Sequence, residues 1–215
     1  RAKEVIISSG SIERPLVFGN NDTPGVMLSS AAKEYLKVYG VLVGKKPIVF
    51  TNNDSGYETA IEFKKNGIDP IILDTRKEVN SEVIKEAKGL NINIKFSYVV
   101  VAAKGYKKVN SADIAKISDD KKNINNIENI KCDCICVSGF WTPTIHLASQ
   151  SGNKTKFNEK IDAFIPSQSK QKETTLGSAN GIFTLEETLK TSFEKGNELS
   201  KNITNKENKI SIPTV

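Results

Sequence analysis

One βαβ pattern between residues 47 and 74 restricts the fold of this chain more than any other feature. The apolar run at 47–50 predicts a strand, and helical spacing from 57 to about 66 follows a polar turn. A second apolar run at 70–73 predicts another strand. Strands that are joined through a crossover helix lie parallel in one sheet. The sequence therefore predicts an α/β fold with a parallel sheet.

The polar turn at 51–56 (TNNDSG) differs from the glycine-rich turn of a dinucleotide-binding unit. In such a unit, glycines let backbone N–H groups approach a pyrophosphate, and an acidic residue at the end of the second strand holds a ribose. Asp74 is placed as the ribose residue requires, but the turn contains a single glycine and Asp54 adds negative charge. Two interpretations stay open: the turn binds a nucleotide, or it is a retained Rossmann scaffold in which Asp54 caps the helix.

The rest of the chain continues the alternation of helices and strands. Apolar spacing predicts further helices at 28–39 and about 81–88, and a capping box of Thr184 and Glu187 predicts a last one. The other predicted strands are 5–7, taken as buried, 99–103 and 106–109 in an antiparallel meander, and 132–137. The segments interpreted as polar are 119–129, taken as a surface loop, and 153–177, apart from an apolar run at 163–165.

Charge and hydropathy argue against several classes of protein. The net charge is +6, but the 31 basic residues are scattered among 25 acidic ones, which disfavours a nucleic-acid surface. No apolar run approaches the ~20 residues of a membrane-spanning helix, and the start of the chain is not a signal peptide. The sequence begins without Met and almost inside a strand, so we expect that an upstream segment has been removed.

Three cysteines alternate within the predicted strand, at Cys132, Cys134 and Cys136. An odd number of cysteines so close together is no disulfide framework, and a zinc site needs further ligands where this chain has the single histidine His146. We expect free thiols that share one buried face of the strand, no metal, and a reducing cytoplasmic location.

Two further segments suggest a cofactor. Residues 8–15 (SSGSIERP) end a strand in Ser-Gly and continue into Arg-Pro, which is typical of two-dinucleotide flavoproteins of the thioredoxin-reductase type. Residues 177–181 (GSANG) form a turn before the last helix, where such folds place a turn over the cofactor. Each segment also has a simpler interpretation, as a strand-to-turn junction with Arg14 in a surface pair and as an ordinary Asn-Gly turn.

Taken together, these segments resemble the alpha subunits of heterotetrameric sarcosine oxidase from about residue 1 to 202. The runs that carry the resemblance are IERPLVF at 12–18, NDTPGVML at 21–28, VFTNNDS at 49–55, VSGFWTP at 137–143, HLASQSG at 146–152 and ANGIF at 179–183. The resemblance implies that cofactor-facing positions are Gly10, Arg14, Asn180 and Gly181, followed by Thr51, Asn52 and Asp54. It implies no catalytic residue in this chain.

The family's activity is the oxidative demethylation of sarcosine to glycine, with one-carbon transfer to tetrahydrofolate. The resemblance implies FAD in the beta subunit, FMN at the alpha–beta interface, and NAD bound by the full alpha subunit. It implies beta, gamma and delta subunits as partners and a folate-binding domain outside this sequence. Two other hypotheses stay open: an NAD(P)H-dependent flavoprotein reductase of the thioredoxin-reductase type, and a non-catalytic interaction module.

The resulting expectation is a three-layer FAD/NAD(P)-binding fold in two parts, with a parallel sheet and a small antiparallel meander. An inserted Rossmann-like domain is expected at 45–152. The first dinucleotide domain is expected to be incomplete, to be split between 1–44 and 153–203, and to be followed by a tail at 204–215. We expect a chain of this kind to expose apolar surface and to self-associate.

Overall fold

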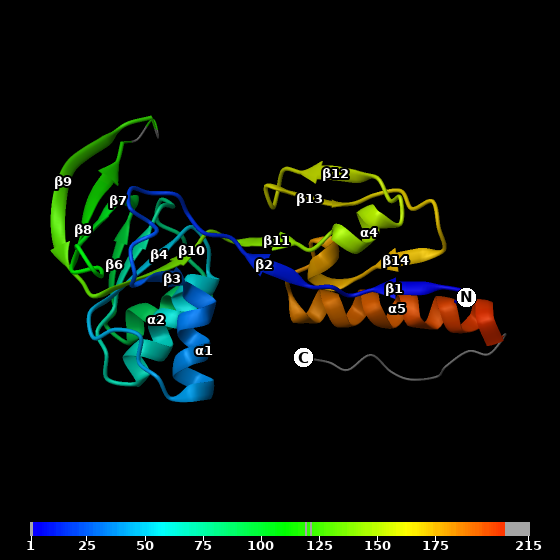
Figure 1. Ribbon diagram of the computed structural model, residues 1–215. Helices are drawn as coiled ribbons and strands as arrows, with labels where there is room; N and C mark the ends of the chain where they lie inside the picture. The colour runs from blue at the N-terminus through cyan, green and yellow to red at the C-terminus, as the bar shows by residue number, and fades with distance from the viewer. Residues whose placement is uncertain (1, 119, 121, 205–215) are drawn as a thin grey trace. The chain divides into compact units, whose positions relative to one another are not determined.

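The chain divides into two compact units in a computed structural model (Figure 1). The inserted unit is Glu13–Phe140, and the terminal unit contains the residues up to Ile12 and from Trp141 onward. The residues that the structure describes are 2–118, 120 and 122–204.

These boundaries differ from the expected insertion at 45–152. Residues 13–44 fold with the inserted unit because β3 (Val26–Leu28) joins its parallel sheet and α1 (Ser29–Tyr39) packs on it. At the other end, β11 (Trp141–Pro143) contacts β13 (Ala163–Pro166), so the chain returns to the terminal unit directly after Phe140.

A five-stranded sheet in the order β3-β10-β4-β5-β6 forms the centre of the inserted unit. All neighbouring strands are parallel, and α2 (Ser55–Lys65) is the crossover from β4 to β5. The bounds of the remaining strands are β4 Pro47–Thr51, β5 Ile71–Asp74, β6 Asn93–Phe96 and β10 Cys134–Ser138. The predicted parallel α/β sheet is therefore confirmed.

The sheet separates two apolar clusters because side chains alternate between its faces. On one face Val49 and Ile72 pack among α1, α2 and α3 (Glu82–Gly89). On the other face Ile48 and Phe50 pack toward the antiparallel sheet of β7 (Tyr98–Lys104), β8 (Ser111–Ile117) and β9 (Ile124–Lys131). Helices, parallel sheet and antiparallel sheet form the three predicted layers (Figure 1).

The antiparallel sheet differs from the prediction in two places. The segment predicted as a strand at 106–109 is a turn, which the bond from Asn110 N to Lys104 O closes, and Tyr106 is 97% exposed. The loop predicted at 119–129 contains most of β9, whereas residue 119 lies outside the described residues. β9 is an exposed edge strand, so its Asn and Lys residues face solvent and hide the strand pattern.

The three cysteines are buried free thiols, as predicted. Cys134 and Cys136 share the helix-covered face of β10, with their sulfur atoms 3.6 Å apart. Cys132 precedes the strand and lies in the other apolar cluster, so the prediction of one shared face is wrong for this residue.

Glu13 connects the start of the inserted unit to α1. Its carboxylate, only 3% exposed, accepts hydrogen bonds from Ser30 N (2.8 Å) and Ser30 Oγ (2.6 Å). An anionic acceptor at the first turn of a helix satisfies free N–H groups and interacts favourably with the helix dipole. The helix ends as predicted at Gly40, whose φ of 63° is left-handed.

In the terminal unit, β1 (Val5–Ile7) pairs in parallel with β14 (Glu173–Thr175), and β12 (Thr155–Asn158) pairs with β13. The β1 prediction is correct in type but wrong in burial, since Val5 is 46% and Ile6 47% exposed. β2 (Ser11–Glu13) pairs with β11, and its last residue, Glu13, is the first of the inserted unit. The other short elements of the terminal unit are α4 (His146–Gln150) and the 3-10 turn η1 (Gly177–Asn180).

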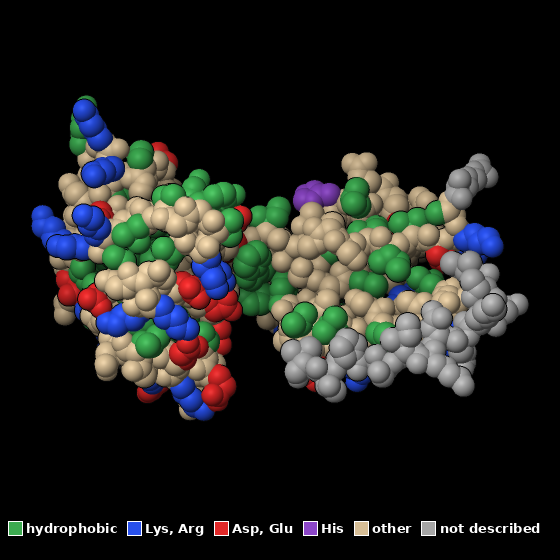
Figure 2. Space-filling view, turned by 90° about the horizontal axis from the view of Figure 1, so that it is seen from below, with side chains coloured by type: hydrophobic (Ala, Val, Ile, Leu, Met, Phe, Trp, Pro, Cys, Tyr) green, Lys and Arg blue, Asp and Glu red, His purple; other side chains and the backbone are tan. Residues whose placement is uncertain are grey.

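The last helix, α5 (Leu185–Thr204), begins at the predicted capping box, where Glu187 N donates to Thr184 Oγ1 (3.4 Å). Residues 205–215 of the expected tail lie outside the described residues. Within the described part of the chain, no helix is long and apolar enough to cross a membrane. On the face drawn in Figure 2, basic and acidic side chains are interspersed over the inserted unit.

The approach of the chain to β4 generates a prediction about Gly44. A Cβ at this position would lie 2.7 Å from both Asp133 Oδ1 and Cys134 Cβ. We expect Gly44→Ala to lower the free energy of unfolding by about 1–3 kcal/mol, because the hydrogen-bonded Asp133 carboxylate and the buried Cys134 must shift. Gly89→Ala is the matched control, since its Cβ meets nothing within 4 Å. Urea unfolding measures the free energy of unfolding of both variants. Equal values for Gly44→Ala and Gly89→Ala would contradict the prediction.

Candidate functional site

The carboxyl edge of the parallel sheet is where α/β folds bind ligands, at the point where the strand connections diverge. In this sheet that point lies between β10 and β4, since β5 and β6 continue on one side and β3 lies on the other. The turn after β4, the last residue of β5 and the end of β10 all reach this edge.

Asn53 fills this point with its own side chain, which is only 6% exposed. Its Nδ2 group donates to Ser138 O (3.1 Å), Ser138 Oγ (3.2 Å) and Asn52 Oδ1 (3.0 Å). Its Oδ1 atom accepts hydrogen bonds from Ser55 N (2.9 Å) and from Ser55 Oγ. We call Asn53, Ser55 and Ser138 the Asn53 clasp, because one carboxamide connects β4, α2 and β10.

The clasp changes which residue caps α2. The sequence suggested that Asp54 caps this helix, but Asp54 makes no side-chain cap bond. Asn53 Oδ1 instead accepts the Ser55 N–H, which is the kind of helix N-terminal donor that a pyrophosphate oxygen accepts in a dinucleotide site. The protein thus supplies its own acceptor.

Thr51, the last residue of β4, is fully buried beside the Asn53 clasp. Its Oγ1 atom donates to Asn53 O (2.9 Å) and accepts from Asn53 N (3.1 Å). A Cβ on Gly56 would lie only 2.6 Å from that same Oγ1 atom. The single glycine of the turn therefore permits close packing of helix on strand, which is one of the roles of the glycines in a dinucleotide-binding turn.

Asp74, the residue expected to hold a ribose, is fully buried and binds protein groups instead. Its carboxylate accepts hydrogen bonds from Tyr57 Oη (2.7 Å), Arg76 N (2.9 Å) and Arg76 Nη2 (2.8 Å). The same guanidinium forms an ion pair with Asp54 (2.8 Å). Burial, and then the hydrogen bond to Asp74, raise the pKa of Tyr57 far above its ordinary value of 10.0.

This geometry does not fit a dinucleotide in the 51–56 turn. Side chains of Thr51 and Asn53 stand where a dinucleotide site has bare backbone, and the ribose acceptor Asp74 already has protein partners. Asp54 adds a carboxylate beside the turn, and the Arg76 guanidinium is already ion-paired with Asp54 and Asp74, so it is not free to bind a pyrophosphate.

The other predicted residue of the inserted unit, Arg14, lies at the end of β10. Arg14 Nε donates to Gly139 O (3.0 Å), Arg14 N donates to Phe140 O (2.8 Å), and Gly139 N donates back to Arg14 O. Asn52 N donates to Ser138 O (3.3 Å). The structure therefore gathers Arg14, Thr51, Asn52 and Asp54 at one edge of the sheet.

The three predicted residues of the terminal unit follow its two parallel strands, Gly10 in the loop after β1 and Asn180 and Gly181 at the end of the 3-10 turn η1 after β14. Gly10 follows β1, with a φ of 76° and open space around its missing Cβ, and Asn180 and Gly181 follow β14. Because β1 and β14 are parallel, both segments leave the same edge. Thr175 at the end of β14 is 8% exposed, and its hydroxyl has no hydrogen-bond partner among the described residues.

Several residues of the carboxyl edge were not found from the sequence as site residues, namely Asn53, Tyr57, Arg76 and Ser138. Asn53 had a usable signal, because an Asn before a helix is a common cap. Ser138 lies 85 residues farther along the chain, so its pairing with Asn53 depends on the sheet order.

The chain has the fold of the FAD/NAD(P)-binding flavoproteins. It superposes on T. acidophilum thioredoxin reductase with a TM-score of 0.66 at 18% identity, covering 85% of this chain and 59% of that one. The flavoprotein disulfide reductase RclA from Escherichia coli gives a TM-score of 0.66 at 14% identity, with 94% of this chain and 44% of that one covered.

In sequence, the expected resemblance to the sarcosine oxidase alpha subunits is confirmed. The chain is 31% identical over 198 residues to sarcosine oxidase subunit alpha of Corynebacterium sp. (strain P-1), which covers 91% of the chain and 20% of the relative. It is 33% identical over 180 residues to the alpha subunit of Rhizobium meliloti (strain 1021), covering 83% and 17%. The chain thus spans about a fifth of these relatives. No family model matches it.

The bond between Tyr57 and Asp74 generates a pH prediction. The folded-state pKa of Tyr57 is raised, so its stabilising effect is fully present below pH 10.0 and declines above it. We expect Tyr57→Phe to cost about 1.5–3 kcal/mol at pH 8, since a hydrogen bond to a buried carboxylate is lost.

Above pH 10.0 the stability difference between the two proteins should shrink by at most about 1.4 kcal/mol per pH unit. Urea unfolding of wild type and variant from pH 8 to pH 11.5 measures this difference. A difference that stays constant over this range would contradict the assignment.

Proposed function

We propose that this chain is part of the alpha subunit of a sarcosine oxidase, a flavoprotein oxidoreductase, and that its inserted unit is a scaffold. The observation that carries the scaffold proposal is the Asn53 clasp, which places a protein carboxamide at the usual ligand position of the sheet. Side chains of Thr51, Asn52 and Asp54 then stabilise the turn rather than hold a nucleotide.

We assign the cofactor-facing role to the terminal unit. The open backbone at Gly10 and the unpartnered hydroxyl of Thr175 fit a polar group of a flavin or dinucleotide at this edge. Asn180 and Gly181 lie at the end of the 3-10 turn η1, which follows β14 at the same edge. A flavin bound there would supply electron transfer, while these residues would position it and exclude water.

The complete enzyme of this proposal oxidises sarcosine to glycine in the cytoplasm and passes the one-carbon unit to tetrahydrofolate. FAD belongs to the beta subunit, FMN to the alpha–beta interface, and NAD to the full alpha subunit. The gamma and delta subunits complete the heterotetramer. The support is the sequence similarity to sarcosine oxidase alpha subunits over most of this chain.

The alternative of a thioredoxin-reductase type reductase has less support. That chemistry uses a reactive Cys-x-x-Cys pair, and the cysteines here alternate and are buried. Burial raises the pKa of the Cys132 thiol to about 12. Contact with the Cys134 thiol, followed by burial, raises the pKa of Cys136. Thiols of this kind are poor nucleophiles at neutral pH.

Calorimetric titration of the chain with NAD, FMN and FAD in turn tests the scaffold proposal. We expect no saturable binding of NAD up to about 1 mM, because Asn53 Oδ1 already accepts the Ser55 N–H that would donate to a pyrophosphate oxygen. Asn52→Ala and Asn180→Ala are matched variants that each remove one carboxamide, one in each unit. Micromolar NAD binding that Asn52→Ala abolishes and Asn180→Ala preserves would contradict the proposal.

A further inference from the structure

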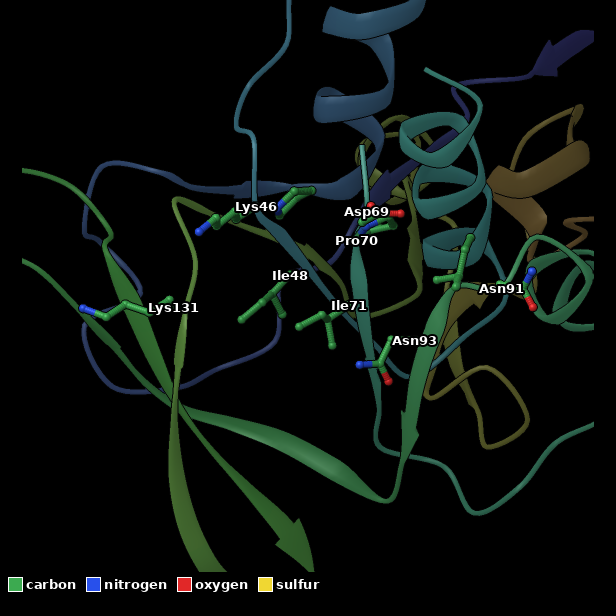
Figure 3. A pocket seen from close by; sticks show the side chains of 10 residues that line it. Lys46, Ile48, Asp69, Pro70, Ile71, Asn91, Asn93 and Lys131 are labelled. Atoms are coloured by element: carbon green, nitrogen blue, oxygen red, sulfur yellow. The ribbon is translucent and has the colours of Figure 1, made fainter. Parts of the chain in front are cut away.

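The amino edge of the parallel sheet carries a hollow of about 370 Å³, but most of its apolar lining is closed (Figure 3). Pro47, Ile48 and Ile92 are buried, and Ile48, at 1% exposed, belongs to a core cluster. Figure 3 draws the ammonium end of Lys131 pointing away from Ile48 and Ile71. A ligand at this edge would therefore meet little apolar surface.

The outer face of α1 carries another hollow, of about 280 Å³, and its lining is accessible. Its four lining residues are Ala31, Glu34, Tyr35 and Tyr39. Residues three or four apart are neighbours on a helix surface, so these four side chains share one stripe of α1. Tyr35 is 47% and Tyr39 65% exposed, so a ligand can reach both rings.

The helix that carries this stripe is held in place on its other side. Ala32 is fully buried in the core cluster on the helix-covered face of the sheet, and Leu36 packs against that cluster. After α1 ends, Val41 N donates to Tyr35 O (2.9 Å), which closes the turn at Gly40. The backbone under both tyrosines is therefore fixed before a ligand binds.

The two tyrosine rings form the aromatic part of the hollow. Their centroids lie 6.0 Å apart, and their planes are tilted by 49°. Because the rings do not stack flat on each other, a part of each face remains open. The face of an aromatic ring is electrically negative and attracts a cation that lies within about 6 Å of the ring centroid.

The charges around the hollow also favour a cation. Within the described part of the chain, the Glu34 carboxylate has no cationic partner, whereas the neighbouring Lys33 and Lys37 are ion-paired with Glu58 (2.6 Å) and Glu62 (3.2 Å). The hollow reaches the last turn of α1, where the helix dipole is negative. A free carboxylate, two ring faces and a helix end thus act with the same sign.

The chemistry of the lining selects the kind of cation. A metal ion or a primary ammonium is strongly hydrated, and Glu34 alone is a poor replacement for its water shell. Among the described residues, no group of three or more His, Cys, Asp or Glu side chains could hold a metal ion. A methylated ammonium instead presents methyl groups, which pack on aromatic faces and on the Ala31 methyl group while the charge is kept.

We propose that this hollow binds a small organic cation through a trimethylammonium group. The methyl groups contact the rings of Tyr35 and Tyr39, and the positive charge faces Glu34. Ala31 leaves room for the group because its side chain is a single methyl. The proposal does not depend on the function assigned to the carboxyl edge.

The test uses tetramethylammonium as the probe and NMR titration of the whole chain, at constant ionic strength, as the readout. We expect saturable shifts at the lining residues, with a dissociation constant on the order of 10 mM. The neutral tert-butyl alcohol, of similar size, should bind more weakly by about 5- to 10-fold because it lacks the charge. Ammonium should also bind more weakly, because it has no methyl groups and keeps its water.

Two pairs of variants separate the rings from the carboxylate. Tyr39→Leu should weaken binding of tetramethylammonium by about 3- to 5-fold, and Tyr106→Leu, at a tyrosine that is 97% exposed outside the hollow, should leave it unchanged. Glu34→Gln should weaken it by about 2- to 5-fold, and Glu186→Gln, at an exposed glutamate of α5, should not. All four positions are exposed, so these variants should fold.

A steric variant tests the place of the ligand without a change of charge. Ala31→Leu should abolish the saturable shifts, because its larger side chain fills the hollow, while both residues favour a helix. No saturable binding by the unchanged chain, equal binding of tert-butyl alcohol, or equal effects within either pair of variants would each overturn the proposal.

Discussion

The carboxamide of Asn53 connects the two halves of the parallel sheet at the point where their connections diverge. It donates to β10 and accepts from the first turn of α2, while Thr51 beneath it holds the turn backbone. Each such hydrogen bond contributes about 1 kcal/mol to stability, but a buried amide that loses its partner costs more than that. Removal of one partner of the clasp therefore destabilises the groups that remain. The remaining geometry of the carboxyl edge depends on this closed arrangement.

The residues at the end of β10 accept further hydrogen bonds at the carboxyl edge. Ser138 accepts hydrogen bonds from Asn52 and Asn53, and the next residue, Gly139, accepts one from Arg14. One residue earlier in the chain, Glu13 binds the first turn of α1. The segment at this edge, where a dinucleotide-binding domain contacts its cofactor, is thus used for internal hydrogen bonding in this chain.

Much of the fold could be predicted from the sequence because its pattern is local. The βαβ unit, the helix that ends at Gly40 and the capping box at Thr184 each depend on a few neighbouring residues. β9 was missed because an exposed edge strand carries polar residues on both faces. The partnership of Asn53 with Ser138, and that of Asp74 with Arg76 and Tyr57, required the three-dimensional structure, since composition cannot show whether a carboxylate or a carboxamide is already satisfied.

The central claim is that the protein's own carboxamide occupies the ligand position of the sheet. NMR hydrogen exchange of the side-chain amide protons of Asn53, with and without NAD, tests it most directly. The account predicts exchange much slower than for the exposed carboxamide of Asn93, and signals that NAD does not move. Exchange as fast as that of Asn93, together with NAD-dependent shifts at Asn53 and Ser55, would contradict it.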